Sequence, residues 1–337
     1  MKLAAEAINS AGLVDRRTVV LAAALGSATL IGTKGAIAQN YPSRLITIVM
    51  PYAAGGSTDV IARVIADKLR ALLGATIIVE NRQGAGGAIG ATLVARAEPD
   101  GYTLLLTPSG AIAIAPLVMK PSPFDPVKDL TPVAALHKYQ LFLYARTDGG
   151  YRSMEELLSA HKAGKSISMA VTGRGNSTHY SAFTLGKETG IEFVNIPYNS
   201  GSQAALSIMK GEADVGFLPA VDVQPQIDSG AIRALLVTSQ TPSPAFPDVP
   251  GLSKFGLKGP EIDVWIGLFG PRGLPEDIAT KLNRALSTIY NSGELDKYLK
   301  GCEKMSGSAS ELAATLAKDV EKYQRFIVAA DFSQEQK

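Results

Sequence analysis

The sequence predicts an α/β protein built from two Rossmann-like lobes with a cleft between them. Strand and helix patterns alternate from Tyr41 onwards, and a proline-rich stretch at 241–250 interrupts the alternation. One design, a buried strand followed by a glycine turn, a Ser-Thr pair and a helix, occurs once in each half of the chain. Alternating strands and helices of this kind form a mostly parallel sheet with helices on both faces.

The repeated design predicts where a ligand binds. The first copy is the strand 46–50, the turn 51–58 and a helix from Asp59, and the second is the strand 167–171, the turn 172–178 and a helix from His179. Glycine lets the backbone approach a ligand closely, and a Ser or Thr cap leaves free N–H groups at the helix start. Because such a helix start binds anions, the two copies predict two lobes that hold one small acidic molecule.

The remaining elements follow from period-2 and period-3.6 patterns. The expected strands are 45–50, 76–79, 102–107, 140–146, 166–171, 193–196, 214–218, 233–238 and 264–269. The expected helices are 59–73, 87–97, 154–161, 177–189, 202–210, 221–229, 275–291 and 309–329.

The best division of the chain is discontinuous. We expect lobe one to hold 41–142 plus 250–337, and lobe two to hold 143–249. The chain then crosses twice between the lobes, near 142–146 and near 239–250. Two such crossings predict a hinge, with the ligand between the lobes at the carboxyl ends of the strands.

Residues 1–38 have the pattern of an export signal. A polar start with Arg16 and Arg17 precedes a short apolar stretch, and Ala36-Ile37-Ala38 matches a cleavage site. The arginine pair resembles a twin-arginine signal, and an ordinary secretory signal with two arginines is the alternative. The apolar stretch is shorter than the roughly 20 residues of a membrane-spanning helix. We therefore expect a periplasmic protein that begins near Gln39.

Composition excludes several classes of protein. The net charge of +2 belongs to the signal, which carries two more basic than acidic residues, so the mature chain is neutral and no nucleic acid is expected. Cys302 is the only cysteine, so no internal disulfide forms, and we interpret this residue as structural or incidental. His137, His161 and His179 lack the spacing of metal ligands. Gly84, Gly86 and Gly90 miss the spacing of a dinucleotide-binding loop, so no cofactor is expected.

The candidate ligand-binding residues lie in loops that follow strands. They are Tyr52, Ala53, Gly55, Gly56, Ser57, Thr58, Asp59, Ser109, Gly110, Gly173, Arg174, Gly175, Asn176, Ser177, Thr178, His179, Tyr198, Asn199, Gly201, Phe217 and Leu218. His179 either donates to the ligand or braces its loop, and Arg174 is either a charge partner or an exposed side chain. Trp265, the only tryptophan, lines the cleft or packs in the core. Ser177 and His179 are spaced poorly for proton transfer, so no catalytic residue is expected.

An ordered series of segments resembles one family along nearly the whole mature chain. The segments are Tyr41-Pro-Ser-Arg, Pro51-Tyr-Ala-Ala-Gly-Gly-Ser-Thr-Asp59, Val79-Glu-Asn-Arg82, Pro99-Asp-Gly-Tyr-Thr-Leu104, Phe124-Asp-Pro-Val-Lys-Asp129, Gly173-x-Gly-x-x-x-His179, Ile196-Pro-Tyr198, Arg233-Ala-Leu, Pro247-Asp-Val-Pro250 and Trp265-x-Gly. Together they resemble the Bug-type extracytoplasmic solute receptors of tripartite tricarboxylate transporters. The resemblance implies a type II periplasmic binding fold with a Venus-flytrap closure. It also implies capture of a small carboxylate by backbone N–H groups, hydroxyls and water, for a large and a small integral membrane subunit.

Two loops depart from the family pattern. Asn199 and Ser200 stand where a basic residue and glycine are usual, and Leu218 with Pro219 stands where aspartate is frequent. These changes indicate a less polar pocket wall and favour a monocarboxylate with an apolar or aromatic body. The sequence thus predicts a monomeric, non-catalytic receptor that delivers a carboxylate to a transporter. The alternative is the ligand-binding component of a signalling system with a membrane sensor.

Overall fold

The computed structural model describes residues 41–259, 261–330 and 332, and the expected export segment lies outside these residues. The strands are β1 Ile46–Met50, β2 Ile77–Asn81, β3 Thr103–Pro108, β4 Leu130–Arg146, β5 Ile167–Val171, β6 Phe193–Pro197, β7 Val215–Pro219, β8 Ile232–Val237, β9 Asp263–Pro271 and β10 Glu303–Lys304. The longer helices are α2 Ser57–Leu73, α3 Ala88–Ala95, α7 Met154–Lys162, α8 Ser177–Thr189, α9 Gly201–Lys210, α10 Ala220–Asp228, α11 Glu276–Asn291 and α12 Ala309–Ala330. Short helical turns are η1 Ala85–Gly87, α4 Gly110–Ala113, α5 Ala115–Val118, α6 Pro126–Asp129, η2 Leu252–Phe255 and η3 Asp296–Tyr298.

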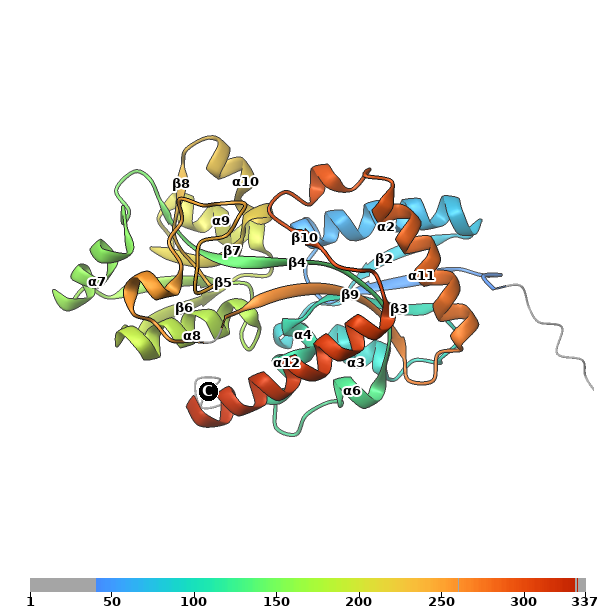
Figure 1. Cartoon of the computed structure of the whole chain (residues 1–337). Coiled ribbons are helices and arrows are strands. Elements are labelled where there is room, and N and C mark those ends of the chain that lie inside the picture. The colour runs from blue at the N-terminus through green and yellow to red at the C-terminus, as the bar shows by residue number, and fades with distance from the viewer. Residues whose placement is uncertain (1–40, 260, 331, 333–337) are drawn as a thin grey trace, which may run out of the picture. The chain divides into compact units, whose positions relative to one another are not determined.

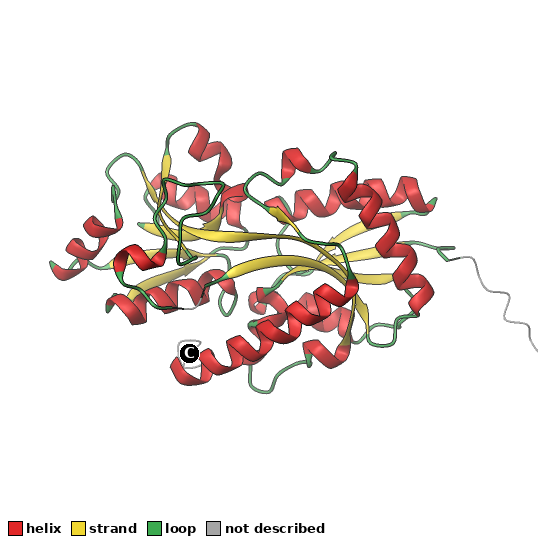
Figure 2. Cartoon of the chain, in the orientation of Figure 1, coloured by secondary structure: helices red, strands yellow, loops and turns green. Residues whose placement is uncertain are grey.

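The strands form a ten-stranded sheet in the order β2-β1-β3-β9-β4-β7-β5-β6, with β8 and β10 also paired to β4. Strands β1, β2 and β3 are parallel to one another, and so are β5, β6 and β7. Helices cover the strands on both faces (Figure 2). This is the arrangement that alternating strand and helix patterns predict.

The long strand β4 joins the two groups of parallel strands. Its residues from Leu130 to Gln140 pair with β9, whereas those from Leu141 to Arg146 pair with β7 and β8. Figure 1 shows β4 and β9 running side by side between the two groups. We call the strands β1, β2, β3 and β9 with their helices lobe one, and β5 to β8 with theirs lobe two. The change of partner falls between Gln140 and Leu141, two residues before the expected boundary.

Thr238 ties together the two places where the chain passes between the lobes. Its hydroxyl accepts from the Leu141 N–H at 3.2 Å and lies 2.9 Å from the Ile262 carbonyl oxygen. Its backbone N–H donates to the Leu141 carbonyl at 3.0 Å. Because Thr238 is buried, these bonds compete little with water and fix the crossing segments to each other.

The C-terminal helix α12, which the sequence assigns to lobe one, also contacts lobe two near its C-terminal end. The ring of Tyr323 meets the ring of Tyr180 in α8, with centroids 5.4 Å apart, and Phe332 packs on Phe183 at 4.8 Å. Trp265 belongs to the core, since it is 2% exposed and its indole N–H donates to Asp319 of α12 at 2.8 Å. No helix within the described ranges combines the length and apolar character needed to cross a bilayer.

Candidate functional site

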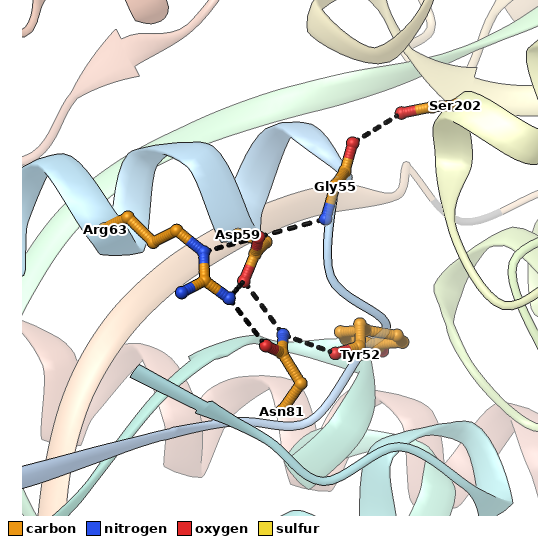
Figure 3. Close-up of polar contacts among 6 residues, drawn as sticks. All are labelled: Tyr52, Gly55, Asp59, Arg63, Asn81 and Ser202. Carbon is orange, nitrogen blue, oxygen red and sulfur yellow. Dashed lines mark hydrogen bonds and ion pairs between the residues drawn. The ribbon is translucent and has the colours of Figure 1, made fainter. Parts of the chain in front are cut away.

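The loop before α2 is held in place by the buried carboxylate of Asp59 (Figure 3). Asp59 accepts hydrogen bonds from the Gly55 N–H at 3.0 Å, from Arg63 Nε at 3.0 Å and from Asn81 Nδ2 at 2.9 Å. Burial raises the pKa of Asp59, but the bonds from Arg63, Gly55 and Asn81 outweigh burial and lower it. Asp59 is therefore an ionised anchor that shapes the Tyr52–Asp59 loop.

The start of α8 leaves two backbone N–H groups open. The Asn176 side chain caps the helix: its Oδ1 accepts from the His179 N–H at 3.2 Å, and its Nδ2 donates to the Thr172 carbonyl at 2.7 Å. Within the part of the chain that the structure describes, the N–H groups of Ser177 and Thr178 have no protein partner. Such groups at a helix start, together with the helix dipole, form an anion-binding position.

His179 braces the loop in front of α8. Its Nδ1 accepts from the Gly175 N–H at 3.0 Å, and burial together with the nearby charge of Arg174 lowers its pKa to about 4. The imidazole is therefore neutral at physiological pH, and Nδ1 is already occupied. This arrangement does not offer Ser177 a catalytic base at Nδ1.

The two lobes touch through loops that carry predicted site residues. Ser202 Oγ of lobe two donates to the Gly55 carbonyl of lobe one at 3.1 Å (Figure 3), and the Ala53 N–H donates to the Asn199 carbonyl at 3.3 Å. Gly110 of lobe one lies against Ser177, and a Cβ at Gly110 would stand 2.7 Å from the Ser177 nitrogen. The lobes are therefore closed on each other, and glycine is required at position 110 for this closeness.

A cavity of about 60 Å³ lies between these loops. One water needs roughly 10–15 Å³ of cavity, so the space suits a small molecule. The residues around it come from both lobes and from the crossing strands: Tyr52, Ala53, Gly56, Ser57, Thr58, Asp59, Pro108, Tyr139, Leu141, Thr172, Asn176, Ser177, Thr178, Ser200, Gly201, Pro219, Asp222 and Val264. None of these lining residues is Lys, Arg or His.

The titratable side chains of the cavity are two acids and two tyrosines. Burial, followed by the charge of Asp222, raises the pKa of Tyr139 well above its usual value, and burial does the same for Tyr52. Both hydroxyls are thus protonated donors, and that of Tyr52 donates to the Gly86 carbonyl at 3.2 Å. Burial also raises the pKa of Asp222, against the opposing hydrogen bonds from Ser57.

Eleven of the predicted site residues do not line the cavity: Gly55, Ser109, Gly110, Gly173, Arg174, Gly175, His179, Tyr198, Asn199, Phe217 and Leu218. Phe217 and Leu218 are core residues of β7, with 1% and 0% exposure. Ser109 is also buried, with no hydrogen-bond partner for its hydroxyl. Several of the others support the cavity instead, as Gly55 does by bonding Asp59 and Ser202.

Eight lining residues lie outside the predicted set: Pro108, Tyr139, Leu141, Thr172, Ser200, Pro219, Asp222 and Val264. Of these, Thr172, Ser200 and Pro219 belong to loops that the sequence already indicated as part of the pocket. Tyr139, Leu141 and Val264 lie on β4 and β9, the strands that cross between the lobes, and the first ten residues of β4 were not expected to be a strand. Asp222 carried a usable signal, since it is an acid in the first turn of a helix that directly follows a buried strand.

Comparison with known proteins identifies the family to which the chain is similar. Residues 61–332 match the model of the tripartite tricarboxylate transporter family receptor. The chain is 34% identical to Protein BugT of Bordetella pertussis over 259 residues, covering 76% of this chain and 79% of BugT.

Two solved structures extend the match to the fold. The periplasmic binding protein BugD superposes with a TM-score of 0.80 and 32% identity, over 87% of this chain and 99% of BugD. MatC of Rhodopseudomonas palustris, solved with bound malate, gives a TM-score of 0.79 and 30% identity, over 85% of this chain and 99% of MatC. The predicted two-lobed periplasmic binding fold is confirmed, and the chain belongs to the receptor family of the tripartite tricarboxylate transporters.

Proposed function

We propose that this protein is a periplasmic receptor that captures a small carboxylate between its lobes. The proposal rests on the start of α8, where Ser177 and Thr178 line a cavity between the lobes and their N–H groups have no partner among the described residues. A carboxylate there satisfies groups that otherwise stay unpaired. The malate bound in MatC supports this class of ligand.

Closure follows from the same geometry. Residues 41–142 with 250–337 form one lobe, 143–249 form the other, and the crossing segments at Leu141 and Thr238 serve as the hinge. A ligand bound at α8 that also reaches the Tyr52–Asp59 loop favours the closed state, because only that state presents both sets of donors. The ligand-binding residues in this proposal are the cavity-lining members of the predicted set.

The protein's biological role rests on its family. We propose that it is exported with cleavage near Ala38, by a twin-arginine or secretory route, and acts as a monomer without catalysis. The closed receptor hands its ligand to the large and small membrane subunits of a tripartite transporter. Ligand uptake by cells that express those subunits tests this step, and uptake that is independent of the receptor contradicts it.

A thermal-shift screen tests carboxylate capture. Mature protein, unfolded and refolded to remove bound ligand, is screened against aliphatic, aromatic and amino-acid carboxylates. At 100 times its Kd a ligand of the folded state adds about 2.7 kcal/mol, which raises the melting temperature by roughly 5 °C.

The variant Ser177→Ala removes the hydroxyl of a cavity-lining residue and should weaken binding about 10- to 150-fold, since a hydrogen bond to a charged group is worth about 1.5–3 kcal/mol. Ser229→Ala, at the exposed end of α10, is the matched control and leaves binding unchanged. A protein that no carboxylate stabilises contradicts the proposed function.

A further inference from the structure

Asp222 lines the cavity and accepts a hydrogen bond at the start of α2, one of the two helix starts beside the cavity. Asp222 lies in the first turn of α10, and its Oδ1 accepts from the Ser57 N–H at the beginning of α2, at 3.0 Å. The bond runs from lobe two to lobe one. The helix start that resembles an anion site in lobe one is therefore filled by the protein's own carboxylate.

The position of this carboxylate depends on a missing side chain. A Cβ at Gly201, the first residue of α9, would lie 1.8 Å from Asp222 Oδ2. The carboxylate thus rests directly on the start of α9 while it bonds the start of α2. Any larger residue at position 201 would displace Asp222 from the cavity wall.

The charge of Asp222 is not balanced by a cation. Among the described residues, no Lys, Arg or His lines the cavity and no ion pair includes Asp222. Asp59, the other acid of the wall, is paired with Arg63 and Asn81. Burial of Asp222 without a cation disfavours its charged form and raises its pKa. A positive or N–H-donating group in the cavity would relieve this cost, whereas a second carboxylate beside it would add repulsion.

We propose that the ligand is an amino carboxylate, with its carboxylate on the Ser177–Thr178 N–H groups of α8 and its ammonium group against Asp222. This proposal rests on the proposed function and restricts its ligand class. It assigns to Asp222 the selection of carboxylates that carry an ammonium group over monocarboxylates and dicarboxylates that lack one. Tyr52 and Tyr139, whose hydroxyls stay protonated, also line the cavity.

Isothermal titration calorimetry with matched short acids tests the assignment. The probes are alanine, β-alanine and 4-aminobutanoate, their unsubstituted partners propanoate and butanoate, and the diacid succinate. We expect at least one amino acid to bind about 100-fold more tightly than its unsubstituted partner, the size of effect that removing one partner of a desolvated charge pair produces. We expect Asp222→Asn to abolish this preference.

Asp228→Asn is the matched control, because it makes the same charge change at the exposed end of α10. This variant should keep the preference of the wild type. Two results would overturn the assignment of Asp222. One is that propanoate, butanoate or succinate binds as tightly as the amino acids, and the other is that the preference survives Asp222→Asn. Neither result contradicts the proposal that the protein is a carboxylate receptor. Failure of every acid in the panel to bind overturns the assignment of Asp222 to short amino acids, whereas the proposed function falls only if the wider thermal-shift screen also finds no ligand.

Discussion

Substituting alanine for Gly110 should impair closure of the lobes without unfolding either lobe. Gly110 begins the short helix α4, so alanine suits its backbone. The new Cβ would stand 2.5 Å from Ser177 Oγ and 2.7 Å from the Ser177 nitrogen, and the backbone nitrogen cannot rotate away. Contacts under 3.0 Å require one partner to shift, and such overpacking costs about 1–3 kcal/mol.

This cost is paid only in the closed state, so the affinity for the ligand should fall about 5- to 150-fold. Titration calorimetry measures the affinity, and small-angle scattering with and without ligand measures the closure. Gly90→Ala is the contrasting variant, because its Cβ would stand 2.8 Å from the Arg82 carbonyl within lobe one and should lower the melting temperature instead. Gly110→Ala protein that binds and compacts like the wild type would refute the reasoning.

Four further outcomes follow from single side chains. Asp59→Ala should lower the free energy of unfolding by about 2 kcal/mol at pH 7 in urea titrations. The difference from the wild type should shrink as the pH falls through the lowered native pKa of Asp59, below 3.8. A difference that does not depend on pH would contradict the anchoring role of Asp59. Asp222→Asn should stabilise the ligand-free protein at pH 7, because the native pKa of Asp222 is raised and the wild type is destabilised once Asp222 ionises. The gain in the free energy of unfolding should vanish below about pH 4, where Asp222 is protonated. A variant that is less stable than the wild type at pH 7 would argue against an unbalanced charge at Asp222. Thr238→Val should lower the free energy of unfolding by about 1–3 kcal/mol, because it leaves buried hydrogen-bond partners unpaired. An unchanged urea midpoint would show that Thr238 does not hold the crossing segments together. Burial and then Asp222 raise the pKa of the Cys302 thiol to about 12, so iodoacetamide at pH 8 should modify it on the order of 1,000-fold more slowly than in the urea-unfolded chain; equal rates would show that the thiol is not shielded.

The elements that are determined by short segments of sequence, such as capped helices and apolar strands, could be predicted. Helix α8 begins at Ser177 and ends at Thr189 as expected, because Asn176 caps it and Gly190 ends it in a left-handed conformation. Strands β1 and β5 are continuous apolar runs between turn residues, which is the pattern of a buried parallel strand. The two helix starts that front the cavity were found for the same reason.

The long-range features could not be predicted in this way. The first ten residues of β4 contain Pro132 and the buried His137, and the register against β9 shifts twice there, so no alternation is visible. The contact of α12 with lobe two depends on side chains such as Tyr323 that meet α8 only in the folded chain. Asp222 is recognisable in the sequence as an acid in the first turn of a helix that follows a buried strand, but its hydrogen bond with Ser57 of lobe one exists only in the folded chain.

A crystal structure of the protein with a carboxylate from the thermal-shift screen is the most direct test of the binding mode. We predict carboxylate oxygens within hydrogen-bond distance of the Ser177 and Thr178 nitrogens, at the start of α8, with the lobes closed around them. A carboxylate held elsewhere in the molecule, with these two N–H groups facing water, would contradict the proposed mechanism of capture.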